Sequence, residues 1–217
     1  TLFRSQKEYI EVDTNPESYT VLVNREHPLP KDYIPAELVV PHIEFSYSGT
    51  YEKSYMRVRA AKALEKLFAA ALKENHRLVG VSAYRSYERQ DQIYKNNVRS
   101  KGQEKANLVS AIPGSSEHQL GLAMDVGRRT NSKLRQSFGN SPEGKWLAEN
   151  CYRFGFILRY KAEWVETTGY AYEPWHIRYV GLEHAQRIQE LDIPFEDYIA
   201  LIRGAARQAG AEQGETP

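Results

Sequence analysis

Residues 114–126 read Gly-Ser-Ser-Glu-His-Gln-Leu-Gly-Leu-Ala-Met-Asp-Val. The apolar run at 120–126 predicts a buried strand, and the small residues before it suit a place where backbone segments approach closely. Gly121 is expected at such a contact, because a glycine within a strand pattern leaves room for a neighbouring backbone. The stretch therefore places an imidazole, His118, ahead of a buried strand and a carboxylate, Asp125, at its end.

The flanking segments predict further helices and strands. Apolar residues at helical spacing predict a helix over 53–75, with a buried face made of Met56, Ala60, Leu64, Leu67, Phe68, Ala71 and Leu72. Other helices are expected over 87–100, from the cap Ser141-Pro142 to Gly155, over 182–191, and from Pro194 to about Arg203. Strands are expected near 21 and over 77–83, 156–160 and 175–180. Because helices and strands do not alternate regularly, the fold class is α+β, a small, mostly antiparallel sheet flanked by helices.

A single domain is expected over residues 21–203. Residues 1–20 are polar, with an alternating patch at 9–12, and are interpreted as an N-terminal arm. Residues 204–217, rich in Ala, Gly, Gln and Glu, are interpreted as a flexible C-terminal tail. The sequence begins with Thr1 and not with Met, so a leader or anchor is expected to be absent from it.

Composition excludes several classes of protein. The 217 residues are 41% hydrophobic and 26% charged, which is typical of globular chains and argues against disorder. No apolar run approaches the ~20 residues of a membrane span. The 29 Lys and Arg residues against 28 Asp and Glu lack the basic excess of a nucleic-acid binder. The one cysteine, Cys151, excludes an internal disulfide and a cysteine-based zinc site.

A second unusual histidine, His176, follows Tyr-Glu-Pro-Trp. Imidazole and carboxylate groups are good zinc ligands, and a catalytic zinc keeps three protein ligands and one open position. His118, Asp125 and His176 would form such a set. Glu173 would then be a free carboxylate, able to take a proton from a zinc-activated water and pass it to a leaving amine. Two histidines and an aspartate at this spacing also occur by chance in many proteins. A lone histidine in a strand is usually a structural residue.

Other polar and aromatic residues have two interpretations each. Arg85 follows a buried strand and precedes a helix, so it either clamps a substrate carboxylate or forms a salt bridge at the sheet rim. The 15 tyrosines suit a groove for a polar, extended ligand, and they suit an ordinary fold nearly as well. Tyr84, Tyr160, Tyr172 and Trp175 either line such a groove or belong to the core.

The combined motif resembles a known family. Ser116-x-His118-x-x-Gly121-x-Ala123-x-Asp125 followed by Glu173-x-Trp175-His176 resembles the signature of the zinc D-Ala peptidases of the VanY, VanX and LdcB type. The segment Ser-Ala-Tyr-Arg85-Ser with Gln90, and the segment Phe-Gly-Phe-Ile-Leu-Arg-Tyr160, resemble the VanY/LdcB branch. The resemblance covers about residues 20–203.

This resemblance implies a Zn²⁺ ion, a fold and a reaction. The metal ligands would be His118, Asp125 and His176, with Glu173 as catalytic base and then acid. Catalytic Arg85 would help to stabilise the oxyanion, and the substrate contacts would be Arg85, Gln90, Ser116, Tyr160 and Trp175. The fold would be that of DD-peptidases and Hedgehog domains. The substrate would be a peptidoglycan stem peptide ending in D-Ala. Because such stems lie outside the cytoplasmic membrane, an exported protein of the bacterial cell envelope is expected, and a monomer is the default expectation for its oligomeric state.

Several alternatives stay open at this point. The enzyme would act as a D,D-carboxypeptidase on pentapeptides, an L,D-carboxypeptidase on tetrapeptides, or a bifunctional dipeptidase and carboxypeptidase. A phage-type endopeptidase is disfavoured by the intact Tyr-Arg-Ser segment around Arg85. A different class of function is a non-catalytic, zinc-containing module that binds peptidoglycan, against which the intact Glu173 argues.

Overall fold

A four-stranded antiparallel sheet lies at the centre of the computed structural model, which describes residues 13–213. Its strands, in spatial order, are β3 (Leu78–Ser82), β4 (Ala123–Arg128), β6 (Glu173–Tyr179) and β5 (Phe156–Tyr160). A short second sheet pairs β1 (Leu38–Val39) with β2 (Met56–Arg57). The α+β class with a small antiparallel sheet is thus confirmed.

The central strands β4 and β6 carry apolar side chains on one face and polar side chains on the other. Met124 and Val126 of β4 and Ile177 of β6 are fully buried in the main hydrophobic core. Because side chains alternate along a strand, Asp125 and its direct cross-strand partner His176 project to the opposite face. The sheet therefore has one apolar face and one face that carries buried polar groups.

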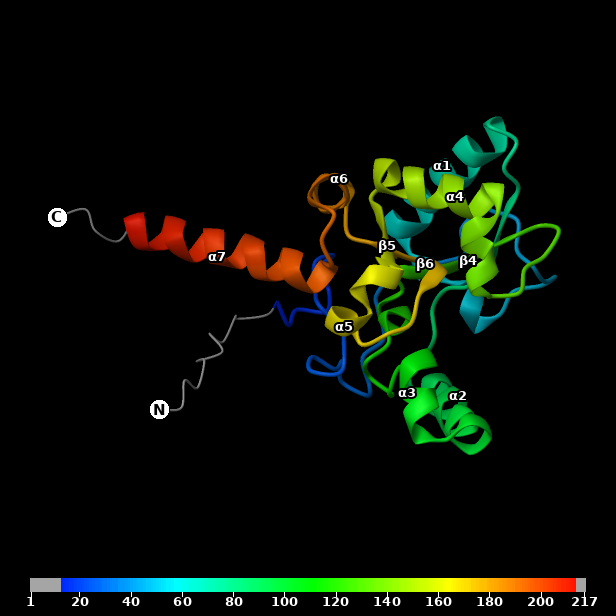
Figure 1. Cartoon of the computed structure of the whole chain (residues 1–217), viewed down its shortest axis with the longest axis horizontal. Coiled ribbons are helices and arrows are strands. Elements are labelled where there is room, and N and C mark those ends of the chain that lie inside the picture. Colours follow the sequence, from blue (N-terminus) through cyan, green and yellow to red (C-terminus); the bar gives the residue numbers. More distant parts are fainter. Residues whose placement is uncertain (1–12, 214–217) are drawn as a thin grey trace.

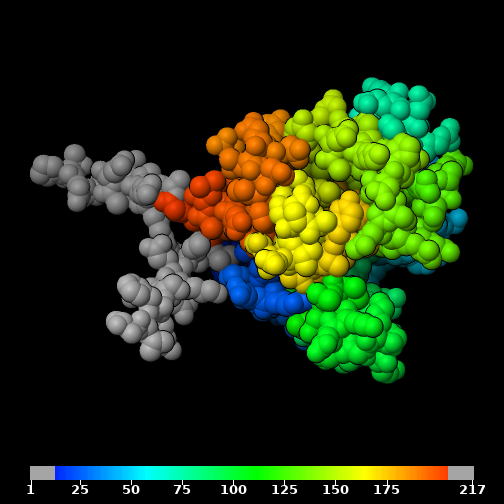
Figure 2. All heavy atoms as spheres, in the orientation of Figure 1, coloured from blue at the N-terminus to red at the C-terminus, as the bar shows by residue number. Residues whose placement is uncertain are grey.

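Helices surround the central sheet (Figure 1). Helix α1 (Val58–Lys73) contacts β3 and α4 (Pro142–Asn150), while α6 (Leu182–Leu191) contacts β5. Helices α2 (Tyr87–Lys101) and α3 (Gln103–Val109) pack on each other and form the green lobe of Figure 2. The short α5 (Val165–Thr168) precedes β6, and α7 (Phe195–Gln213) projects from the body in Figure 1. Single 3₁₀ turns occur at Glu52–Ser54, Glu117–Leu120, Gln136–Asn140, Cys151–Phe154 and Ala162–Trp164.

Local signals in the sequence correctly locate several element ends. The Ser141 hydroxyl accepts a hydrogen bond from the Gly144 backbone N–H, Pro142 opens the helix, and Gly155 has a φ of 82° after the turn that ends it. The close approach expected at Gly121 is present, because a Cβ there would lie 2.8 Å from Leu38 Cδ2. Cys151 is buried, as expected of a small core residue.

Some predicted boundaries are wrong. The helix predicted from residue 53 begins at Val58, because Met56 and Arg57 pair with β1 instead. Leu72, the last residue of the predicted buried face, is 56% exposed. The strand predicted over 120–126 begins at Ala123, since Gly121 ends the preceding 3₁₀ turn with a φ of 65°.

The segment around residue 21 also differs from its prediction. Residues 21–23 are buried in the core but form no strand. The Val21 carbonyl instead accepts a hydrogen bond from the Arg178 guanidinium. Helix α7 continues past Arg203 to Gln213. The alternating patch at 9–12 and the last residues of the predicted tail lie outside the described residues, and the boundaries of the arm and tail stay predictions.

Within residues 13–213, no helix combines the length and the apolar character needed to cross a bilayer.

Candidate metal centre and active site

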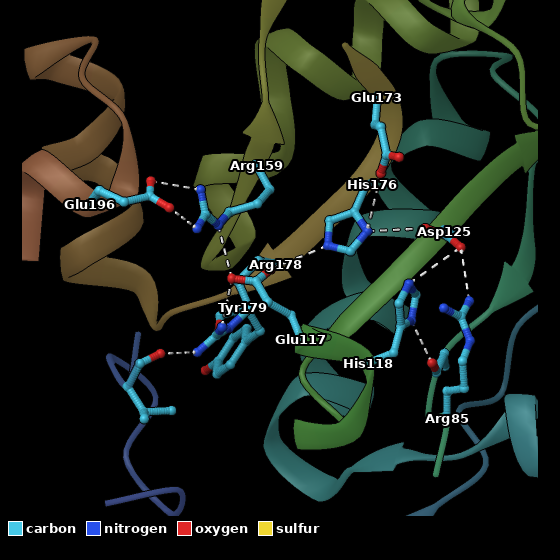
Figure 3. A network of polar contacts seen from close by, with 12 residues as sticks. Arg85, Glu117, His118, Asp125, Arg159, Glu173, His176, Arg178, Tyr179 and Glu196 are labelled. Carbon is cyan, nitrogen blue, oxygen red and sulfur yellow. Dashed lines mark hydrogen bonds and ion pairs between the residues drawn. The ribbon is translucent and has the colours of Figure 1, made fainter. Parts of the chain in front are cut away.

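The three predicted metal ligands lie together on the polar face of the sheet. His118 comes from the 3₁₀ turn ahead of β4, Asp125 from β4 and His176 from β6. His118 Nε2 lies 3.4 Å from Asp125 Oδ2, and His176 Nδ1 lies 3.2 Å from Asp125 Oδ1 (Figure 3). One ligand atom from each residue falls within 4.8 Å of the others. The carboxylate therefore stands between two imidazoles, a donor set suited to Zn²⁺.

The outer nitrogen of each imidazole has a fixed partner. His118 Nδ1 lies 2.6 Å from the Ala83 carbonyl, to which it can only donate. His176 Nε2 lies 3.2 Å from Glu117 Oε2. These contacts leave His118 Nε2 and His176 Nδ1 directed at Asp125, as is usual for histidines that bind a metal. The donor set thus fits a zinc ion.

Burial and neighbouring charges set the protonation of this cluster. Burial alone would raise the pKa of Asp125, but His118 and His176 hold it well below its usual range. Burial lowers the pKa of His118, and Arg85 adds to that shift. Burial would also lower the pKa of His176, but hydrogen bonds to Asp125 and Glu117 raise it to about 9. A cation that binds here would displace the His176 proton.

Glu173 lies at the start of β6, next to this cluster. Its Oε2 atom is 3.9 Å from His176 Nδ1, and Tyr160 is its cross-strand partner on β5. Burial raises the pKa of Glu173 to about 7, opposed by His176 and reinforced by the Asp125 charge. A carboxyl group with such a pKa can both accept and return a proton near neutral pH.

Arg85 lies on the other side of Asp125. Its Nη2 atom is 3.9 Å from Asp125 Oδ2 and 3.3 Å from the Ser82 hydroxyl, and its Nη1 donates to Gln90 Oε1 at 2.8 Å. Gln90 is only 1% exposed and donates its own amide to the Ala111 carbonyl at 2.7 Å. Gln90 therefore holds the guanidinium of Arg85 in place from behind.

A cavity of about 580 Å³ brings the predicted site residues together. It is lined by every one of them, namely Arg85, Gln90, Ser116, His118, Asp125, Tyr160, Glu173, Trp175 and His176. Residues of α2 and α3 form one wall, and residues 170–173 belong to the lining as well. Tyr172 lines the cavity, whereas Tyr84 is buried outside its lining.

One residue of this site was missed by the sequence interpretation. Glu117 is fully buried and contacts His176, but the motif leaves the position between Ser116 and His118 unspecified. The available signal was a charged residue in a run of small and apolar ones, since an acid is almost never fully buried unless it is paired.

Known proteins with similar sequences are carboxypeptidases by name. A family model described as VanY, D-alanyl-D-alanine carboxypeptidase, matches residues 53–182. A relative from Bacillus subtilis (strain 168), named "Putative carboxypeptidase YodJ", is 46% identical over 195 residues, which cover 89% of this chain and 71% of the relative.

Two solved structures are similar along most of their length. The LdcB LD-carboxypeptidase has a TM-score of 0.81 at 48% identity, covering 85% of this chain and 86% of that one. The vancomycin resistance D,D-pentapeptidase VanY in complex with Zn(II) has a TM-score of 0.69 at 36% identity, covering 83% of this chain and 98% of that one. The fold and site are thus those of a metallopeptidase, a hydrolase. The chain belongs to the VanY family of D-alanyl-D-alanine carboxypeptidases, which confirms the resemblance inferred from the motif.

Proposed function

We propose that this chain is a zinc carboxypeptidase that removes the C-terminal D-alanine from peptidoglycan stem peptides. The observation that carries the proposal is the position of Asp125 between His118 and His176, with Glu173 and Arg85 in the same cavity. Two relatives support the substrate class. One is the LdcB carboxypeptidase, studied for peptidoglycan recognition, and the other is VanYB, solved in complex with D-Ala-D-Ala.

His118 through Nε2, Asp125, and His176 through Nδ1 would hold the zinc ion. When bound, zinc lowers the pKa of a water molecule and polarises a substrate carbonyl. The cross-strand pairing of Asp125 with His176 keeps two of the three ligands on adjacent central strands. The site therefore needs little rearrangement to accept the ion.

Glu173 serves as the general base and then as the general acid. Its carboxylate takes one proton from the attacking water, whose oxygen bonds to the carbonyl carbon of the last peptide bond. The same proton then goes to the leaving nitrogen of D-alanine as the C–N bond breaks. Burial supports this role, because the raised pKa of Glu173 makes both transfers accessible near neutral pH.

Arg85 provides a positive charge for the substrate. Its guanidinium has five N–H donors, of which Gln90 and Ser82 occupy only part. The others are available to a substrate carboxylate or to the oxyanion that forms during hydrolysis. Ser116, Tyr160 and Trp175 would contact the peptide, since they line the same cavity.

Overall likeness favours the L,D activity over the D,D activity. The LdcB structure is nearer in identity and in TM-score than the VanY structure. We therefore expect faster release of D-Ala from a tetrapeptide stem than from a pentapeptide stem, measured by mass spectrometry of the products. Release from the pentapeptide alone would assign the D,D activity instead. Because stem peptides lie outside the cytoplasmic membrane, the place of action would be the cell envelope.

Glu173→Gln tests the catalytic proposal. We expect the variant to bind zinc while its kcat falls by about 10²–10⁴-fold, the usual contribution of a general base. Glu166→Gln, a change of the same type at an exposed position, is the control and keeps wild-type activity. A wild-type protein that binds both stems but releases no D-Ala from either would contradict the enzyme proposal and favour the non-catalytic binding module.

A further inference from the structure

Behind the candidate metal centre, Glu117 connects His176 to two buried arginines (Figure 3). Its Oε2 atom faces His176 Nε2 at 3.2 Å. Its Oε1 atom accepts hydrogen bonds from Arg159 Nε at 2.8 Å and from Arg178 Nη1 at 2.9 Å. The side chains of Glu117, Arg159 and Arg178 are at most 1% exposed. Both oxygens of the carboxylate are therefore committed, one of them to the histidine.

Each arginine is also attached to a more distant part of the chain. Arg159 donates through Nη1 and Nη2 to both carboxylate oxygens of Glu196, at 3.0 and 2.6 Å. Glu196 lies in the first turn of α7. Arg178 donates through Nη2 to the carbonyls of Tyr19 and Val21, at 3.1 and 3.0 Å. A continuous polar path thus joins His176 to helix α7 and to the N-terminal segment.

The charges along this path balance. Two glutamates face two arginines, and a planar guanidinium pairs with both oxygens of a carboxylate in one rigid geometry. Within residues 13–213, Arg159 forms a salt bridge with one further acid, Glu196, whereas Arg178 forms one with Glu117 only. Removing the Glu196 charge would therefore leave Glu117 as the one carboxylate paired with Arg159. Since Glu117 also accepts from His176, a change at Glu196 would reach the imidazole through two shared contacts.

We propose that Glu117 positions His176 for zinc, and that Glu196 of helix α7 supports this role through Arg159. A carboxylate at Nε2 keeps a proton on that nitrogen, so Nδ1, which lies beside Asp125, is the nitrogen that would offer its lone pair to the metal. The same contact makes the imidazole a more basic ligand. The inference rests on the proposed zinc site, but it does not depend on the reaction or the substrate.

The Zn²⁺ affinity of the full chain, measured by competition with a chromogenic chelator, tests this role. We expect Glu117→Gln to weaken Zn²⁺ binding by about 10–100-fold, as is usual when an outer partner of a metal-binding histidine is lost. Glu196→Gln is expected to weaken it by about two- to thirtyfold, the range for changes along a coupled network. Asp197→Asn removes one charge from the next residue of the same helix, at an exposed position, and should leave the affinity unchanged.

A spectroscopic signature separates positioning from stability. The visible absorption of the Co²⁺-substituted protein reports the ligand geometry, so it should change in Glu117→Gln and in Glu196→Gln but not in Asp197→Asn. Melting temperatures identify which variants are folded. If Glu117→Gln does not fold, Glu196→Gln carries the test, because Glu196 lies at the partly exposed end of the path.

Two results would overturn the inference. The first affects the positioning role alone, and the second also affects the proposed metal centre. Folded Glu117→Gln and Glu196→Gln variants that match Asp197→Asn in Zn²⁺ affinity and in Co²⁺ spectrum would remove the positioning role and leave the proposed function intact. A wild-type chain that binds no Zn²⁺ would remove the proposed metal centre as well.

Discussion

Asp125 and His176 are direct partners across the antiparallel strands β4 and β6, with His176 Nδ1 3.2 Å from Asp125 Oδ1. Two of the three candidate ligands are therefore set by the register of the central strands. A slip of β6 by one residue against β4 would turn His176 toward the apolar core and separate it from Asp125. The sheet thus contributes to the metal centre directly.

The Asp125 carboxylate should make the stability of the protein depend on zinc. A ligand that binds only the folded state stabilises it, by about 2.7 kcal/mol at a concentration one hundred times its Kd. We expect the melting temperature to fall on treatment with a chelator and to recover with Zn²⁺, as measured by calorimetry. In Asp125→Asn this recovery should disappear, whereas the exposed control Asp32→Asn should keep it. Equal recovery in both variants would argue against Asp125 as a ligand.

The guanidinium of Arg85 should matter for its shape as well as for its charge. Arg85→Lys keeps the charge but cannot donate to Gln90, Ser82 and a substrate together. Loss of a hydrogen bond to a charged group costs about 1.5–3 kcal/mol, so we expect kcat/KM to fall about 10–100-fold. Steady-state kinetics on stem peptides measure this. Arg89→Lys, at an exposed position of α2, is the matched control, and equal kinetics in the two variants would assign Arg85 a structural role only.

Gly121 should tolerate no side chain. Its φ of 65° is unfavourable for alanine, and a Cβ atom would lie 2.8 Å from Leu38 Cδ2. Gly121→Ala should therefore lower the free energy of unfolding by about 1–3 kcal/mol, measured by urea denaturation. Gly204→Ala lies within α7, where a Cβ meets nothing within 4 Å, and should be neutral or slightly stabilising. The prediction fails if Gly121→Ala is as stable as wild type.

The thiol of Cys151 should be inert in the folded protein. Burial raises its pKa to about 12, so little thiolate exists at pH 8. We expect slow reaction with a disulfide reagent in buffer and fast reaction in urea. The chain holds a single cysteine, so the signal belongs to Cys151 without further controls. Rapid modification of the native protein would show that the 3₁₀ turn Cys151–Phe154 opens readily.

Local patterns were sufficient for several elements. The cap at Ser141 and Pro142 marks the start of α4, because an oxygen that accepts from the first turn and a fixed φ act within a few residues. Helical spacing correctly predicts the buried face of α1 as far as Ala71, whereas Leu72 is exposed. The strand expected near residue 21 is not formed. Residues 21–23 are buried in the core, and the Val21 carbonyl accepts a hydrogen bond from Arg178, which is distant in sequence.

The chemical groups suited to binding a metal and moving a proton can be recognised in the sequence, because they belong to the side chains of His118, Asp125, Glu173 and His176. Their arrangement and the contacts that hold them follow from the fold. Glu117 meets Arg159 and Arg178 across long stretches of chain, in a buried network that no local pattern records. The physical reason is that a buried charge requires a partner, and the fold alone determines which residue lies close enough to be one.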